Sequence, residues 1–232
     1  MIAIILMSAL LFQGTYMKPA IYSEHISQPI KVDGFIDRQW EAAREVGLVY
    51  NNGPYLGKTP AWDTQVKSLW NNDNLYFLFK CKSKNPKPFY QTRDCGLWND
   101  PDKYDIAEVL IDPEGKGREY FEINVNSGGG SLDCRVTYKN KERKWDKTWP
   151  LTPLKIKTRL VNNENGFDGW ICEIAIPWKS ISSSPKAGKS IKVNLFRADN
   201  DLPTPYLAFS PTGIPSFHVP EKFGMLICEK HD

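Results

Sequence analysis

The sequence predicts an all-β fold, an antiparallel β-sandwich of the immunoglobulin-like or jelly-roll-like kind, with one short helix near the N-terminus. Many short apolar runs carry polar side chains at every second position, and this period of two is typical of half-buried strands. Gly, Asn, Asp and Pro separate the runs along the chain. No alternation of strands with long helices is present, so a parallel sheet is not indicated.

The composition argues against several classes of partner and site. The 232 residues include 30 basic and 27 acidic side chains, which gives a net charge of +3. The charges are spread along the chain without a long basic block, so we expect no nucleic-acid partner. The chain has three His and neither an HExxH motif nor a cluster of Cys and His, so the pattern does not indicate a zinc site.

Residues 1–20 are predicted to be a weak signal or leader segment, and residues 21–232 a single domain. The leader contains an apolar run of about ten residues, which is too short to span a bilayer. It lacks basic leading residues and a clear small-residue cleavage site. We therefore expect no membrane span, and a secreted, periplasmic or cell-surface location.

The elements can be assigned in chain order. Asp37 can cap a short helix, of about two turns at most, that carries Trp40, Ala42 and Ala43. The turn NNDN separates two apolar runs and indicates a hairpin. The expected strands are residues 21–26, 64–70, 75–81, 106–112, 120–126, 132–138, 154–161, 170–178 and 190–199, followed by a closing strand near the C-terminus. The composition of residues 51–60, 82–103 and 139–150 favours loops.

The strand at residues 120–126 has the clearest alternation. Phe121, Ile123 and Val125 are expected to face the core, whereas Tyr120, Glu122, Asn124 and Asn126 form a row on the opposite face. The preceding strand adds Glu108 between apolar neighbours. A ring beside carboxylates and amides on a rigid sheet suits a polyhydroxylated ligand, although a solvated sheet face would show the same pattern.

The five cysteines leave two interpretations open. No CxxC spacing is present. Three of them lie in apolar strand-like runs, where a thiol packs as a small hydrophobic group, and two lie in or near expected loops. The residues are Cys81, Cys172 and Cys228 in the runs, and Cys95 and Cys134 in or near the loops. One disulfide or five free thiols would both fit.

The ordered set of segments resembles the family 9 carbohydrate-binding modules and their DOMON-like relatives. The segments are VDGFIDRQWEAA, LYFLFKC, IAEVLID, YFEINVNSGG, GWICEIAIPW, KVNLFRAD and SFHVPEKFGML, and the resemblance extends over nearly all of the chain from about residue 24. The resemblance implies a β-sandwich that binds plant-polysaccharide sugars without catalysis, often beside a glycoside hydrolase. It implies no required cofactor, although some members carry structural calcium.

The resemblance also implies a set of site residues. Glu108 and Asp105 match the acidic positions of the WxxDxVExFID pattern, whose tryptophan falls on Asp102. Trp98 or Tyr104 can take its place if the loop is shifted. The positions that hold Arg and Asn in well-known sugar binders read Glu122 and Asn124 here. The expected ligand-binding residues are Trp98, Tyr104, Glu108, Glu122, Asn124, Asn126, Arg197, Phe217 and His218.

Three alternatives remain open for these residues. Glu108 and Glu122 lie on neighbouring strands and could act as the carboxylate pair of a glycoside hydrolase. Glu108 could instead form a salt bridge with Arg118, Arg135 or Arg197. Some DOMON-like sandwiches hold haem, and His218 with Met225 would be the axial candidates here.

A calcium site is a further alternative. Asp100, Asp102 and Asp105 could offer oxygen ligands together with loop carbonyls, although their spacing is not that of an EF-hand. A polar loop whose carboxylates face water would have the same sequence.

Overall fold

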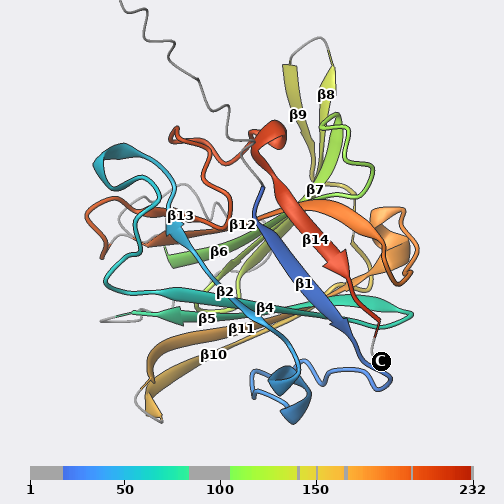
Figure 1. Cartoon of the computed structure of the whole chain (residues 1–232), viewed down its shortest axis with the longest axis horizontal. Coiled ribbons are helices and arrows are strands. Elements are labelled where there is room, and N and C mark those ends of the chain that lie inside the picture. Colours follow the sequence, from blue (N-terminus) through green and yellow to red (C-terminus); the bar gives the residue numbers. More distant parts are fainter. Residues whose placement is uncertain are drawn as a thin grey trace, which may run out of the picture.

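The computed structural model describes residues 18–83, 105–139, 142–149, 151–164, 167–199 and 201–230 (Figure 1). Its strands are β1 (Ala20–His25), β2 (Glu45–Gly47), β3 (Val49–Tyr50), β4 (Thr64–Trp70), β5 (Asn74–Lys82), β6 (Asp105–Asp112), β7 (Glu119–Asn126), β8 (Ser131–Lys139), β9 (Glu142–Asp146), β10 (Lys155–Glu164), β11 (Phe167–Pro177), β12 (Ser190–Asp199), β13 (Tyr206–Ala208) and β14 (Gly224–Cys228). Its helical segments are the short 3₁₀ turns η1 (Arg38–Glu41), η2 (Gly53–Tyr55), η4 (Trp178–Ile181) and η5 (Pro220–Lys222).

The strands form a curled sheet in the order β10-β11-β5-β4-β1-β14-β12-β6-β7-β8-β9. Strand β1 joins its two halves, since Ala20 to Ser23 pair in parallel with β14 and Glu24 and His25 pair in parallel with β4. Figure 1 shows β1 and β14 side by side. Apart from these two pairings of β1, the strand pairs are antiparallel, as the sequence predicts.

The main core lies between the two halves of the sheet. Phe77 and Ile174 from one half and Val109 and Ile123 from the other belong to a single buried apolar cluster. Alternation of side chains along each strand produces this cluster, because every second residue faces inward. The sandwich architecture that the sequence predicts is therefore confirmed, and the opposite face of β6, β7 and β8 is left for other contacts.

The close packing of β11 against β5 depends on Gly169. Its φ is +148°, and a Cβ atom at this position would lie 2.0 Å from the carbonyl oxygen of Cys81. Only glycine fits such an approach of two backbones.

The predicted N-terminal helix is wrong. Residues 38–41 form one 3₁₀ turn, and Asp37 makes no side-chain cap. Instead, Oδ2 of Asp37 accepts a hydrogen bond from the backbone N–H of Lys31. Trp40 is buried and donates through Nε1 to Glu173, so this aromatic anchor, rather than helix propensity, holds the turn against the sheet.

The expected loop at residues 139–150 is also partly wrong, since β9 lies within it and pairs with β8. Figure 1 shows the β8–β9 hairpin extending beyond the rest of the sheet. The short strands β2, β3 and β13 were not predicted either. They pair at the margins of the sheet, where three-residue or shorter runs leave little alternation to detect.

The cysteines that the structure describes are free and buried. Cys81, Cys172 and Cys228 pack in the main core, as expected for small hydrophobic side chains. Cys134 lies within β8, in agreement with the strand expected at residues 132–138, and is buried. Cys95 lies outside the described residues. Among the described residues, no helix has the length and apolar character needed to cross a bilayer.

Candidate functional site

A cavity of about 440 Å³ lies on the face of β6, β7, β8 and β9 that points away from the main core. The loop after β13 covers it on one side. Its lining residues are Glu108, Glu122, Leu132, Arg143, Trp145, Lys147, Tyr206, Pro215, Ser216, Phe217 and His218.

Strand alternation and register place the two carboxylates in this cavity. Glu122 lies opposite Leu110 and Glu108 lies opposite Asn124, so the two glutamates are diagonal neighbours on adjacent strands. Both side chains are buried, and Glu108 is only 2% exposed. Val109 and Ile123, their neighbours in sequence, face the main core and fix this orientation.

Glu122 is held by three donors from three residues. Nδ2 of Asn124 donates to Oε1 at 2.7 Å, while Nε1 of Trp145 donates to Oε2 at 3.0 Å. Sγ of Cys134 lies 3.5 Å from the same Oε2. Burial raises the pKa of Glu122, and these donors partly oppose that rise because they stabilise the carboxylate.

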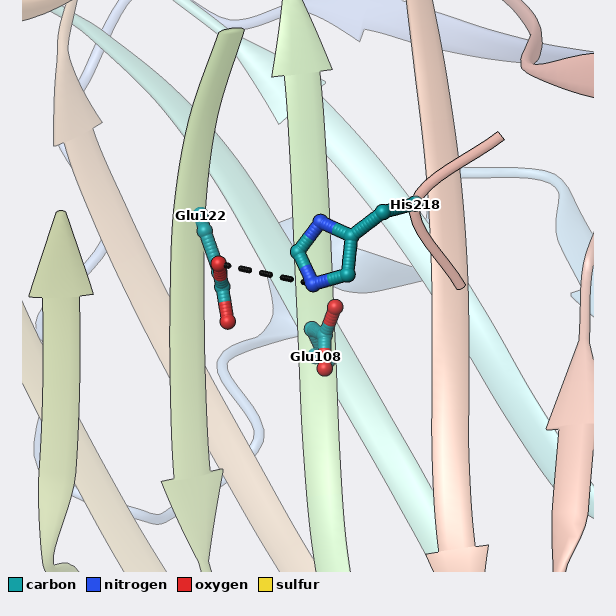
Figure 2. Close-up of side chains that lie close together, drawn as sticks. All are labelled: Glu108, Glu122 and His218. Carbon is teal, nitrogen blue, oxygen red and sulfur yellow. Dashed lines mark ion pairs between the residues drawn. The ribbon is translucent and has the colours of Figure 1, made fainter. Parts of the chain in front are cut away.

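His218 completes a compact group with the two glutamates (Figure 2). One ligand atom from each of the three side chains lies within 4.8 Å of the others, and Nε2 of His218 is 3.8 Å from Oε2 of Glu122. Nδ1 of His218 shares a hydrogen bond of 2.8 Å with the hydroxyl of Tyr120. The hydroxyl of Tyr138 donates to the His218 carbonyl at 3.2 Å, so both the ring and the backbone of this loop residue are fixed.

Burial governs the charge of this group. Burial and the neighbouring Glu122 raise the pKa of Glu108 well above its ordinary value. Burial and the positive charge of Arg143 lower the pKa of His218 to about 3, which leaves its imidazole neutral at physiological pH. Oε1 of Glu108 is buried without a hydrogen-bond partner. A buried oxygen without a hydrogen bond lowers the stability of the protein, so we expect a ligand atom to bind to it.

Aromatic rings form two walls of the cavity. Trp145 is 43% exposed, and the guanidinium of Arg143 lies 4.3 Å from its ring centroid. Phe217 stacks on Phe196 at 4.0 Å and contacts Tyr206 edge to face at 5.3 Å. The cavity therefore combines an accessible indole with buried carboxylates and a cation.

The amides of the polar row have different roles. Asn124 supports Glu122, as described above. Oδ1 of Asn126 accepts hydrogen bonds from the backbone N–H groups of Gly128 and Gly130 and so shapes the turn into β8. Asn126 does not line the cavity, although the sequence places it in the same row.

Arg197 lies on the opposite face from the cavity, which corrects its expected role beside Glu108. Its fully buried guanidinium is 3.0 Å from Asp105 and 2.8 Å from Asp199, and it also donates to Thr64 and the carbonyl of Lys82. Arg135 pairs with Asp146. These two arginines are therefore engaged elsewhere, and Arg118, the third predicted partner of Glu108, is exposed and does not line the cavity.

Asp105 does not fit the predicted calcium site. Its Oδ1 accepts hydrogen bonds from Arg197 and from Nε1 of Trp170, and a cation beside it would face the buried guanidinium. The other two acids of that prediction, Asp100 and Asp102, lie outside the described residues, as do the predicted ligand-binding residues Trp98 and Tyr104.

Seven residues of the cavity lining were not predicted from the sequence: Leu132, Arg143, Trp145, Lys147, Tyr206, Pro215 and Ser216. Trp145 and Arg143 lie on β9, opposite Val136 and Tyr138 of β8, and only this hairpin brings them over the polar row. A signal was present, since Arg143 and Trp145 alternate with Lys144 in a short strand-like run. Met225, the haem candidate, does not line the cavity that contains His218.

Comparisons with known proteins agree with this architecture. The profile of the carbohydrate family 9 binding domain-like family matches residues 32–230. The chain is 27% identical over 165 residues to endo-1,4-beta-xylanase A of Thermotoga neapolitana, covering 70% of this chain and 14% of that protein. The chain thus spans about one seventh of the curated relative it matches.

Solved structures show the same fold at low identity. A candidate carbohydrate-binding protein from Bacteroides uniformis has a TM-score of 0.69 and 20% identity, covering 91% of this chain and 100% of that one. A carbohydrate-binding module of family 9 from Caldicellulosiruptor kristjanssonii in complex with glucose has a TM-score of 0.59 and 18% identity, covering 92% and 97% of the two chains. The same kind of module in complex with cellotriose gives a TM-score of 0.58, with 18% identity and 92% and 95% coverage.

Proposed function

The chain belongs to the carbohydrate family 9 binding domain-like family, and we propose that it binds a plant-type oligosaccharide or polysaccharide in the cavity of β6 to β9, without catalysis. The observation that carries this proposal is the combination, in one cavity, of an exposed indole with two buried carboxylates. Glucose and cellotriose in the related modules of known structure support the choice of a glucan as the first ligand class to test.

The lining has the chemistry that a sugar requires. A sugar ring presents C–H groups on its faces and hydroxyls at its edge, so an aromatic face buries the former while carboxylates and a guanidinium bond to the latter. Trp145 can supply the aromatic face, and Glu122, Glu108 and Arg143 the polar contacts. A volume of about 440 Å³ is within the range of small-molecule sites.

The affinity should be moderate. Each net hydrogen bond contributes about 0.5–1.5 kcal/mol, and the side chains of the lining are already fixed by the sheet. One aromatic platform with three or four polar contacts gives a dissociation constant on the order of micromolar.

Titration calorimetry with cello-, xylo-, manno- and galacturono-oligosaccharides tests the proposal. Trp145→Ala should weaken binding roughly tenfold or more, because a buried aromatic contact is worth about 1.5–3 kcal/mol. The matched control is Tyr55→Ala, since Tyr55 is also exposed and aromatic but lies outside the cavity. Failure of the wild type to bind any of these sugars, or equal losses in both variants, would refute the proposal.

An incubation of the same protein with oligosaccharides distinguishes binding from catalysis. Oligosaccharides incubated with the wild type should be recovered intact. Release of reducing ends that is lost in Glu108→Gln would instead support the glycoside hydrolase alternative with Glu108 and Glu122 as its acids.

We further propose that the chain is exported and acts on polysaccharide beside a glycoside hydrolase. The apolar run within residues 1–20 and the match to part of a xylanase support this setting. Fusion of residues 1–20 to a reporter enzyme that is active only outside the cytoplasm tests the export. An inactive reporter would contradict it.

A further inference from the structure

We propose that Glu108, Glu122 and His218 bind one divalent metal ion of the zinc type on the floor of the cavity (Figure 2). The site shares the cavity with the proposed carbohydrate but does not depend on it, because the three side chains converge in the absence of any sugar. No local sequence motif predicts this metal site, because its three residues come from β6, β7 and the loop before η5.

The donor set and its spacing suit such an ion. Zinc binds imidazole nitrogen and carboxylate oxygen at about 2.0–2.2 Å, which places ligand atoms roughly 3.4 Å apart in a tetrahedral site. Nε2 of His218 is already 3.8 Å from Oε2 of Glu122, and one atom of each side chain lies within 4.8 Å of the others. Small side-chain rotations would close the site. Hard cations such as calcium prefer oxygen ligands alone, so the imidazole favours a transition metal.

The unpartnered oxygen of Glu108 is an independent reason to expect a ligand. Glu108 is 2% exposed and lines the cavity, yet its Oε1 has no hydrogen-bond partner. A buried polar atom of this kind destabilises the folded protein unless a cation or a hydrogen-bond donor binds to it. A divalent ion would satisfy this oxygen and balance two carboxylates that otherwise repel each other.

The surroundings of His218 resemble the support that metal-bound histidines commonly have. When the proton is on Nδ1, the hydroxyl oxygen of Tyr120 accepts it at 2.8 Å, and the lone pair of Nε2 faces the carboxylates. Asn124 and Trp145 orient Glu122 in the same way by donating to its two oxygens. With three protein ligands, a fourth position stays open to water or to a ligand hydroxyl.

Two positively charged residues, Arg143 and Lys147, line the cavity that contains this cluster. Metal binds ionised carboxylates and a neutral imidazole, so zinc binding would release any proton held on Glu108 or Glu122. Arg143 competes with a cation for the carboxylates, so Arg143→Met should strengthen metal binding.

The test is calorimetry of chelator-treated protein with zinc chloride, without sugar. The wild type should bind one zinc ion per chain, and Glu108→Gln and His218→Gln should each weaken that binding at least about tenfold, as loss of a ligand does. His25→Gln is the matched control, because His25 packs on Trp70 at 4.6 Å, outside the cavity. Equal affinity in all four proteins, or no binding in the wild type, would overturn the proposal.

Imidazole nitrogen NMR of the wild type provides a measurement that does not depend on folded variants. The Nε2 resonance of His218 should shift when zinc is added, and the Nδ1 proton should be retained. A zinc titration that leaves this resonance unchanged would overturn the proposal even if zinc bound elsewhere. Repeating the sugar titration with and without zinc keeps the two functions separate, since either can fail alone.

Discussion

Replacement of Arg197 by Met is expected to destabilise the protein strongly, because Arg197 neutralises two buried acids. The side chain is 0% exposed, and it lies 3.0 Å from Asp105 and 2.8 Å from Asp199. Its Nη1 also donates to Thr64 and to the carbonyl of Lys82 at 2.6 Å. Met fills a similar volume but offers none of these donors.

The magnitude follows from what the substitution leaves behind. Removing one partner from a buried ion pair costs about 3–5 kcal/mol, because the remaining charge stays desolvated. At about 2–4 °C per kcal/mol for a chain of this size, the melting temperature should fall by roughly 6–20 °C. Neutralising the acids as well, in Arg197→Met/Asp105→Asn/Asp199→Asn, should recover most of the loss.

Chemical denaturation followed by tryptophan fluorescence measures this free energy of unfolding, provided that the denaturant slope is unchanged. A loss below about 1 kcal/mol would contradict the structural role. Loss of sugar binding in an Arg197 variant that keeps its stability would contradict the structural role more directly, because it would support the ligand-binding role that the sequence predicts for Arg197.

Further predictions concern other buried features. Burial raises the pKa of Asp105 to about 6 from 3.8, so its protonation stabilises the native state at low pH, and this contribution is lost as the pH rises through about 6. Asp105→Asn should therefore make the free energy of unfolding less dependent on pH over this window. An unchanged pH dependence in the variant would refute the reasoning. Gly169→Ala should lower the free energy of unfolding by about 3 kcal/mol or more, because the added Cβ would clash with a backbone oxygen. Gly47→Ala should lower it little, because no atom lies within 4 Å of a Cβ at that position. Equal melting temperatures of the two variants would contradict this. Burial raises the pKa of Cys81 to about 12, so a thiol reagent should label Cys81 and Cys172 only after unfolding, and mass spectrometry of native protein would expose any exception.

Much of the sandwich could be predicted because its central strands have strong local signals. Strands β4 and β12 begin and end at the predicted residues, 64–70 and 190–199, because apolar alternation meets clear turns at their ends. Strand β9 was missed because its sequence, ERKWD, is mostly charged and pairs along one edge with β8. Hydrophobic periodicity has little to detect in such a strand.

The site was only partly predictable for a related reason. Glu108 and Glu122 were identified because each interrupts a strand whose remaining side chains assign its faces. Arg197 was misassigned because β12 is buried on both faces, with Leu195 and Phe196 equally apolar, so the sequence does not show which side the arginine takes. The hydrogen bond of Trp145 to Glu122 depends on the pairing of β9 with β8, and this pairing cannot be recognised from the local sequence of β9.

The most direct test of the proposed function is a crystal structure of the protein with the oligosaccharide that binds best in calorimetry. The account predicts electron density for a sugar ring against Trp145, with hydroxyls within hydrogen-bonding distance of Glu122 or Arg143. Density for the sugar on another face, with the cavity of β6 to β9 free of it, would contradict the account.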